Sequence, residues 1–308
     1  MLRMTEVAAK KYLVVGGSGF IGRHMCQKLI DQGAEVTILS RSKIKAFKKL
    51  NAFWKNELSK CQWIDQLNNT MYFDGVINVS GKSLADGWWT KSFKNQVYQS
   101  RIGVSQILNH YFENCAIKPK VLINASGISI YEQHDKKGVE EIISDKLENH
   151  FSQNLCVDWE QETLKAEQYD IRVCLLRLGV VMGDGGYLNR LKWPLKCGLN
   201  IQLGADYHTF QWIHMDDVVG GIMLLLDTES MKGPINMVAP EVLDLNGLSF
   251  IYRTHFNTKI NIKFSDQVIK WLFGQMGREL LLLNCVIQPQ KLNKNKYNFQ
   301  FSEFKYIF

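Results

Sequence analysis

The chain has 308 residues, of which 46% are hydrophobic and 22% charged, the composition of a globular protein with a large core and without long disorder. Its net charge of +7 does not indicate nucleic acid, because the lysines gather in short runs (43–49 and 291–296) without interleaved aromatic residues. An anionic cofactor or substrate explains this charge equally well. No apolar run has the length of a signal peptide or membrane span, so we expect a cytoplasmic protein that binds neither nucleic acid nor membrane.

The seven cysteines form no Cys-x-x-Cys pair and no cluster with histidines. This spacing predicts neither a disulfide framework nor a metal site. We therefore interpret all seven as reduced thiols.

Strand-like runs alternate with helix-like runs through the first two thirds of the chain. The predicted strands are 12–15, 35–39, 75–79, 121–125 and 172–178, and the clearest helices are 23–32 and 153–166. Such alternation is typical of stacked βαβ units. It predicts an α/β fold with a doubly wound parallel sheet of the Rossmann type.

The pattern changes after residue 179. We predict an apolar helix over 218–226, with Asp216 or Asp217 as its N-cap, and an extended segment over 233–240. The sequence predicts a large α/β domain and a small C-terminal domain, with part of the large domain joining a smaller lobe. The large domain spans 10–240, and its residues 179–233 contribute to the lobe. The small C-terminal domain spans 245–308.

A glycine-rich motif lies directly between the first predicted strand and the first predicted helix. It consists of Gly16, Gly17, Ser18, Gly19, Phe20, Ile21 and Gly22. Glycines at this place allow a tight turn and a close approach of the backbone to a pyrophosphate, which then lies at the helix N-terminus. We predict that these seven residues bind the dinucleotide phosphates; the alternative is a structural turn without a ligand.

The end of the second predicted strand indicates which dinucleotide is bound. NAD sites usually carry an acidic residue there for the ribose hydroxyls, but this strand ends in Ser40, Arg41 and Ser42. An arginine can pair with the 2′-phosphate of NADP. We predict that these three residues select NADP over NAD; the alternative is that Arg41 is a solvated surface residue.

Several motifs together resemble the extended short-chain dehydrogenase/reductases, the group that includes sugar-nucleotide epimerases and dehydratases. The most similar branch is that of epimerase-family proteins of unassigned substrate, sometimes labelled cell-division inhibitors. The resemblance covers nearly the whole chain. It rests on the segments 16–22, 40–42, 74–81, 88–101, 176–186, 212–217 and 233–240, and on the C-terminal segment 279–299.

This resemblance implies roles for matching positions near the cofactor. Ser80 and Gly81 would lie beside the dinucleotide, and Arg101 would face the cofactor or the substrate. Gly179 would border the nicotinamide end. We include these four residues in the predicted cofactor site.

The resemblance also implies substrate-side positions. Trp212 and His214 would belong to the substrate lobe, although core packing explains them equally well. Ser126 would end the fifth strand near the nicotinamide, and Tyr131 follows it in a loop. Ser126 and Tyr131 are the candidate catalytic residues, with His214 as a further candidate; packing of Tyr131 within its loop is the alternative.

One feature of the wider group is missing. Its active members carry Tyr-x-x-x-Lys on the helix after the fifth strand, where the lysine lowers the tyrosine pKa. The corresponding helix here has no such pair. Two functions therefore stay open: an NADP-dependent oxidoreductase or epimerase-like enzyme acting on an unidentified small molecule, and a non-catalytic NADP(H) sensor or scaffold. The sequence does not distinguish a monomer from a homodimer.

Overall fold

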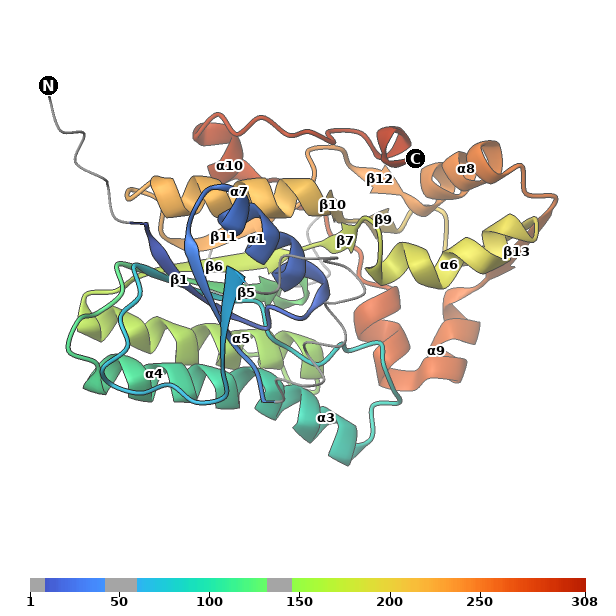
Figure 1. Cartoon of the computed structure of the whole chain (residues 1–308). Helices are drawn as coiled ribbons and strands as arrows, with labels where there is room; N and C mark the ends of the chain where they lie inside the picture. Colours follow the sequence, from blue (N-terminus) through green and yellow to red (C-terminus); the bar gives the residue numbers. More distant parts are fainter. Residues whose placement is uncertain (1–8, 42–59, 132–145) are drawn as a thin grey trace, which may run out of the picture.

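A computed structural model describes residues 9–41, 60–131 and 146–308. Its centre is a seven-stranded parallel sheet with the strand order β11-β6-β5-β4-β1-β2-β3 (Figure 1). The strands are β1 (Lys11–Val15), β2 (Glu35–Leu39), β3 (Cys61–Ile64), β4 (Gly75–Asn78), β5 (Val121–Gly127), β6 (Arg172–Leu178) and β11 (Gly233–Met237). The chain order reverses between β1 and β4, which is the switch point where open α/β sheets bind ligands. The predicted fold class is confirmed.

Helices cover both faces of this sheet because inner strands such as β1 and β4 bury side chains on both sides. The ring of Tyr12 and the side chain of Val14 pack on one face against α1 (Phe20–Asp31) and α7 (Met215–Asp227). Leu13 and Val15 pack on the opposite face, in the cluster that includes α4 (Val104–Asn114). α5 (Phe151–Leu164) lies beside α4, β5 and β6, and α3 (Lys91–Tyr98) precedes α4 through the π-helical turn η2 (Gln99–Gly103).

A second lobe is built from short strand pairs and the later helices. β7 (Val180–Met182) pairs with β10 (Trp212–His214), β8 (Leu199–Leu203) with β13 (Ile260–Phe264), and β9 (Thr209–Phe210) with β12 (Leu243–Asp244). The helices and helical turns of the lobe are α6 (Gly186–Lys196), α8 (Leu245–Phe256), α9 (Asp266–Met276), η5 (Gly277–Leu281) and η6 (Phe304–Ile307). In contrast, α10 (Gln290–Lys294) packs against β11 of the central sheet. The helical turns η3 (Ile128–Ile130) and η4 (Lys165–Tyr169) belong to the sheet domain.

The core of the second lobe mixes residues from both predicted domains. Trp212 and Phe210 pack there with Leu248, Tyr252 and Phe304. Residues beyond 245 thus share a core with the segment that leaves β6. The exact domain bounds stay a prediction.

The predicted strands and helices lie close to the observed ones, and the cap of α7 is the clearest exception. Neither Asp216 nor Asp217 caps this helix, which begins at Met215; its N-cap is His214, whose ring Nδ1 accepts a hydrogen bond of 3.3 Å from the backbone of Asp216. The earlier start places both aspartates in the first turn, where the helix dipole favours negative charge. In the described part of the chain, no helix has the length and hydropathy needed to span a membrane.

Asp217 does not cap α7; its carboxylate instead binds the C-terminal segment of the chain. Its carboxylate is fully buried and accepts hydrogen bonds from the backbone N–H groups of Gln300 (2.8 Å) and Phe301 (3.0 Å) and from the hydroxyl of Tyr297 (3.2 Å). The carboxylate and these donors satisfy one another away from water. Asp217 therefore fixes the C-terminal segment against α7.

We expect Asp217→Ala to lower the free energy of unfolding by about 3 kcal/mol, because it leaves two buried N–H groups without acceptors. Urea unfolding followed by circular dichroism measures this change. The control is Asp216→Ala on the exposed side of the same turn, which should change stability by less than about 1 kcal/mol. Equal effects of the two substitutions would contradict the anchoring role.

Candidate functional site

The glycine motif forms a tight turn between β1 and α1 at the switch point of the sheet. Gly16 has a φ of +83°, and a Cβ atom there would lie 2.8 Å from the backbone of Ser80 at the end of β4. A Cβ at Gly22 would fall on the carbonyl oxygen of Gly16, which accepts a hydrogen bond of 2.8 Å from the N–H of Gly19. The turn therefore needs glycine at positions 16 and 22 for its own packing.

Gly19 is not required for the packing of the turn in the way that Gly16 and Gly22 are. The space in front of it therefore shows whether a dinucleotide fits. Its backbone has ordinary angles (φ −78°, ψ −179°), and among the described residues a Cβ there would meet only the carbonyl oxygen of Gly16 at 3.0 Å. Gly19 is the N-cap of α1, and no side chain caps this helix end. The loop thus leaves room and helix N–H groups for a phosphate, so these residues fit a dinucleotide.

A second glycine-rich loop lies against the start of α1. Cβ atoms at Gly185 and Gly186 would lie 2.7 Å and 2.6 Å from the ring of Phe20, and Arg23 donates a 2.7 Å hydrogen bond to the carbonyl of Asp184. Both glycines have positive φ, which other residues rarely adopt. The loop after β7 therefore adds a second wall beside the phosphate end of the site.

The end of β2 lies at the same edge of the sheet. The backbone N–H of Ser40 donates to the carbonyl of Ile64 on β3 at 2.9 Å, which fixes the strand end. Arg41 is exposed there, and Ser42 lies outside the described residues. The exposed guanidinium of Arg41 is thus available to a ligand or to solvent.

Ser80, Gly81 and Arg101 come together after β4. Ser80 Oγ donates to Asn78 Oδ1 at 2.7 Å, and a Cβ at Gly81 would lie 3.1 Å from the guanidinium carbon of Arg101. Arg101 lies in the π-helical turn η2, donates to the carbonyl of Lys82 at 2.9 Å and lies over the ring of Trp159 at 5.1 Å. π-helical turns occur frequently at functional sites.

Burial lowers the pKa of the Arg101 guanidinium, and the nearest opposing influence is the thiol of Cys156. Among the described residues no carboxylate forms an ion pair with Arg101. Arg101 is half-buried, and a partly desolvated cation without a carboxylate partner is stabilised when an anion is bound beside it. Arg101 is thus suited to an anionic part of a ligand at the switch point.

A fully buried polar network lies at the carboxyl ends of β5, β6 and β11. Arg177 forms a two-pronged ion pair with Glu160, with Nε–Oε1 at 2.9 Å and a second N–Oε2 contact at 2.7 Å. Ser126 Oγ donates to the same carboxylate at 2.7 Å. Arg177 also donates to the hydroxyl of Tyr131 at 2.9 Å, and this hydroxyl donates to Asn236 Oδ1 at 2.5 Å.

The register of the sheet explains this network. Ser126, Arg177 and Asn236 are direct neighbours on three adjacent parallel strands. Burial opposes the charge of Arg177, but the hydrogen bond and charge of Glu160, followed by those of Tyr131, raise the pKa of the guanidinium above its ordinary value. Arg177 is therefore a permanent buried cation that Glu160 neutralises.

The network contains residues that the sequence analysis missed. Glu160, Arg177 and Asn236 were not predicted as site residues, although an arginine within the apolar run 172–178 is a signal of a buried ion pair. The hydroxyls of Ser126 and Tyr131, the predicted catalytic groups, both bond to this network. Their catalytic role stays a prediction.

The helix that carries Tyr-x-x-x-Lys in the wider group has Cys156 and Glu160 four residues apart on one side of α5. Burial, followed by the charge of Glu160, raises the pKa of the Cys156 thiol to about 12. This thiol therefore stays protonated near neutral pH and is neither a base nor a strong nucleophile. Within the described ranges, no group of three or more histidine, cysteine, aspartate or glutamate side chains could hold a metal ion.

The predicted substrate-side residues lie where the two lobes join. The N–H of Gly179 donates to Met237 at 3.0 Å, and Trp212 is 1% exposed with its ring edge-on to Phe304. The ring centroid of His214 lies 3.7 Å from that of Phe301. Burial lowers the pKa of His214 despite the opposing charges of Asp216 and Asp217. Trp212 thus packs in the lobe core, and His214 is neutral at neutral pH.

We expect Gly19→Val to fold normally and to weaken NADPH binding by about tenfold or more, because the side chain would occupy phosphate space. Gly19→Ala should give an intermediate loss. Calorimetric titration with NADPH measures the affinity, and thermal unfolding verifies that each variant is folded. Equal affinities of the wild type and a folded Gly19→Val would exclude the glycine loop as the phosphate site.

The chain is similar to proteins of known family along nearly its whole length. An epimerase family protein of Staphylococcus saprophyticus is 31% identical over 304 residues, which covers 96% of this chain and 97% of the relative. The structure of human epimerase family protein SDR39U1 with NADPH superposes with a TM-score of 0.79 at 24% identity, covering 95% of this chain and 96% of that one.

UDP-glucuronic acid 4-epimerase from Bacillus cereus, in complex with UDP-glucuronic acid and NAD, superposes with a TM-score of 0.71 at 19% identity over 96% of this chain and 98% of that one. These structures share the fold described above. The profile of the NAD dependent epimerase/dehydratase family matches residues 12–238. This profile and the relative from Staphylococcus saprophyticus confirm the resemblance found in the sequence. This chain belongs to the NAD dependent epimerase/dehydratase family.

Proposed function

We propose that this chain binds NADP in preference to NAD and acts as an oxidoreductase or epimerase-like enzyme on a small molecule. The observation that carries the proposal is the glycine turn at the switch point, whose Gly19 leaves open space in front of the uncapped N-terminus of α1. NADP would supply hydride transfer at its nicotinamide. We place the protein in the cytoplasm as a monomer or homodimer.

The preference for NADP rests on the end of β2. Ser40 and the exposed Arg41 occupy the place where NAD sites usually carry an acidic residue. A guanidinium donates charge-assisted hydrogen bonds to a 2′-phosphate, and an acidic side chain would repel it. The proposed cofactor site also includes Ser42, Ser80, Gly81, Arg101 and Gly179.

For the chemical step we propose Ser126 and Tyr131, with the substrate held between the cofactor and the second lobe near Trp212 and His214. An isolated phenol, with a pKa near 10, is a poor base at neutral pH. The cationic guanidinium of Arg177, 2.9 Å from the Tyr131 oxygen, offers the hydrogen bond that a lysine would otherwise supply. Glu160 offsets much of this charge, so we expect slow turnover.

A second candidate function is a non-catalytic NADP(H) sensor or scaffold. One observation favours it: Ser126 and Tyr131 are 5% and 4% exposed, and both hydroxyls already have partners in the buried network. A sensor needs the dinucleotide cradle and no free acid or base. The two functions differ in whether NADPH is oxidised.

We expect Arg41→Ala to weaken NADPH binding by about tenfold or more, since a charge-assisted contact contributes about 1.5–3 kcal/mol. NADH binding should hardly change. Calorimetric titration of both cofactors measures the difference. The control is Arg253→Ala, which removes an exposed arginine from the last turn of α8. If the wild type binds NADH as tightly as NADPH, the preference for NADP is wrong.

We expect Ser126→Ala and Tyr131→Phe each to reduce NADPH oxidation by about tenfold or more, on the scale of a general acid or base. The assay is absorbance of NADPH with a panel of small carbonyl compounds. NADPH affinity and melting temperature are measured for each variant, because loss of turnover with both unchanged separates chemistry from folding. No oxidation by the wild type across the panel would favour the sensor, and unchanged rates in both variants would exclude this pair.

A further inference from the structure

The strand β13 forms an open edge of the second lobe. It pairs with β8 and, among the described residues, with no other strand. Most of its residues are exposed, and it lies on the side of the second lobe away from the central sheet (Figure 1). A two-stranded sheet is marginal on its own, and an open edge carries N–H and C=O groups with which another strand can pair.

The hydrogen bonds to β8 determine which backbone groups face this open edge. The N–H of Ile260 and the C=O of Phe264 both bond to the β8 side, each at 3.0 Å. Alternate residues of a strand bond to the same neighbour in a parallel ladder, so Ile262 also faces β8. The backbone groups of Asn261 and Lys263 therefore point outwards, where they make no hydrogen bond within the described part of the chain.

The side chains of β13 divide between the two faces of the small sheet. Asn261 lies beside Asn200 of β8, whose amide donates to Ser249 Oγ on α8 at 2.7 Å, so α8 covers this face. Ile260 and Ile262 lie on the other face and are 60% and 39% exposed. The residues beside them on β8 are less exposed. Exposure of apolar side chains thus increases towards the open edge, as expected where a further strand is missing.

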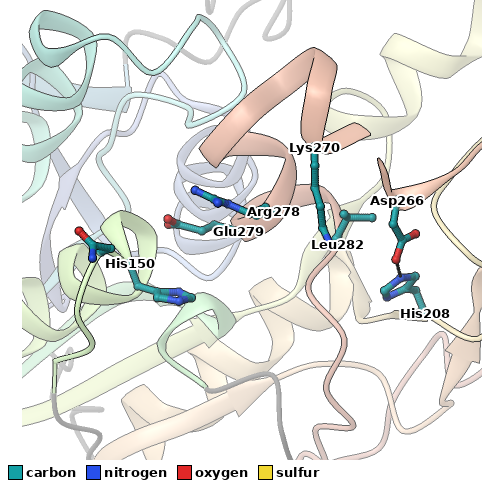
Figure 2. A pocket seen from close by; sticks show the side chains of 8 residues that line it. His150, His208, Asp266, Lys270, Arg278, Glu279 and Leu282 are labelled. Atoms are coloured by element: carbon teal, nitrogen blue, oxygen red, sulfur yellow. Dashed lines mark hydrogen bonds and ion pairs between the residues drawn. The ribbon is translucent and has the colours of Figure 1, made fainter. Parts of the chain in front are cut away.

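The end of β13 is fixed by the turn that follows β8. Figure 2 shows Asp266, at the start of α9, pointing at His208, which bonds to its Oδ2 at 2.9 Å. Its Oδ1 accepts a 3.0 Å hydrogen bond from the N–H of Ala205. Lys263 forms an ion pair of 2.8 Å with Asp206 in the same turn. The edge strand is therefore preorganised, which reduces the entropy lost when another strand pairs with it.

β13 is complementary to itself about its central residue. An antiparallel copy related by a two-fold axis at Ile262 would place this residue beside its own copy. Asn261 would then lie opposite Lys263 of the second copy, in pairs that exchange N–H···O=C hydrogen bonds. Ile260 would lie opposite Phe264 of the second copy. Every residue of the strand has a partner in this arrangement, and its outward backbone groups are satisfied.

The charges of the strand favour this register. Lys263 lies opposite an asparagine, and its ammonium already has Asp206 as a partner. A shift by two residues in one direction would set Lys263 opposite its own copy, and a shift in the other direction would set it opposite Lys259. Like charges directly opposite one another destabilise a strand pair. The strand therefore fits a second copy of itself in one register.

We propose that two copies of this chain associate through β13, which joins their small sheets into one continuous sheet across a two-fold axis. The proposal does not rest on cofactor binding or catalysis. Backbone hydrogen bonds supply the pairing, and Ile262 with its copy forms an apolar contact at the axis. One strand pair of this length gives a small interface, so we expect an association that depends on protein concentration.

The first test is a disulfide at the axis, in a chain whose exposed Cys197 is replaced by serine. Ile262→Cys should give a covalent dimer on mild oxidation, because such a pair has its Cα atoms about 4.5 Å apart, within the range of a disulfide. The matched control is Ile260→Cys, which is more exposed on the same face but would lie roughly 13 Å along the strand from its copy. Non-reducing electrophoresis measures the yield. No dimer at position 262, or equal yields at both positions, would overturn the proposal.

The second test is sedimentation velocity of the wild type over a range of concentrations. We expect the mass to rise from one chain towards two. Ile262→Lys places two like charges side by side at the axis and removes the apolar pair, so it should weaken association by about tenfold. Ile107→Lys makes the same change at an exposed position on α4 and should have no effect. Thermal unfolding verifies that both variants are folded. A wild type that stays monomeric, or equal effects of the two substitutions, would contradict the proposed interface.

Discussion

Arg177 is a large charged side chain with no exposed surface, at the carboxyl end of β6, next to the edge strand β11 of the sheet. The free energy cost of removing a guanidinium from water is far larger than the gain from one hydrogen bond. Neighbouring groups must therefore neutralise the charge of Arg177 and accept hydrogen bonds from its N–H groups. Glu160 supplies the charge, and Tyr131 and Asn236 continue the network. This constraint fixes α5 and the loop after β5 against β6 and β11, and it thereby shapes the wall of the candidate site.

The two halves of the candidate site are built by different means. On the phosphate side the backbone forms the site. Gly16 and Gly22 allow close backbone contacts that a Cβ atom would prevent, and Gly19 leaves room for a ligand. On the opposite side, the buried side chains of the network around Arg177 form the wall of the site. The glycine turn resembles a general binding site for a dinucleotide. The network around Arg177 holds Ser126 and Tyr131, so it determines whether the site can catalyse a specific reaction.

Two buried carboxylates attach later parts of the chain to the sheet domain. Asp217 accepts hydrogen bonds from the backbone N–H groups of Gln300 and Phe301, and Glu279 accepts hydrogen bonds from the backbone N–H and the hydroxyl of Ser152 in the first turn of α5. In both cases a single carboxylate satisfies donors that the local backbone leaves unpaired. The second lobe therefore depends on the same physical device as the network around Arg177, a buried anion surrounded by fixed donors.

The sequence by itself determined the βαβ order, the glycine turn and the place of Arg41, since hydrophobic period and glycine spacing are local properties. It did not determine the cap of α7 or the partners of Ser126 and Tyr131. Tyr131 meets Asn236 across 105 residues of chain, and Ser126 meets Glu160 across 34. Only the register of the parallel sheet brings such residues together, and only burial decides that an arginine in an apolar strand must be paired. The tertiary structure therefore decided which polar groups are used within the protein and which are left for a ligand.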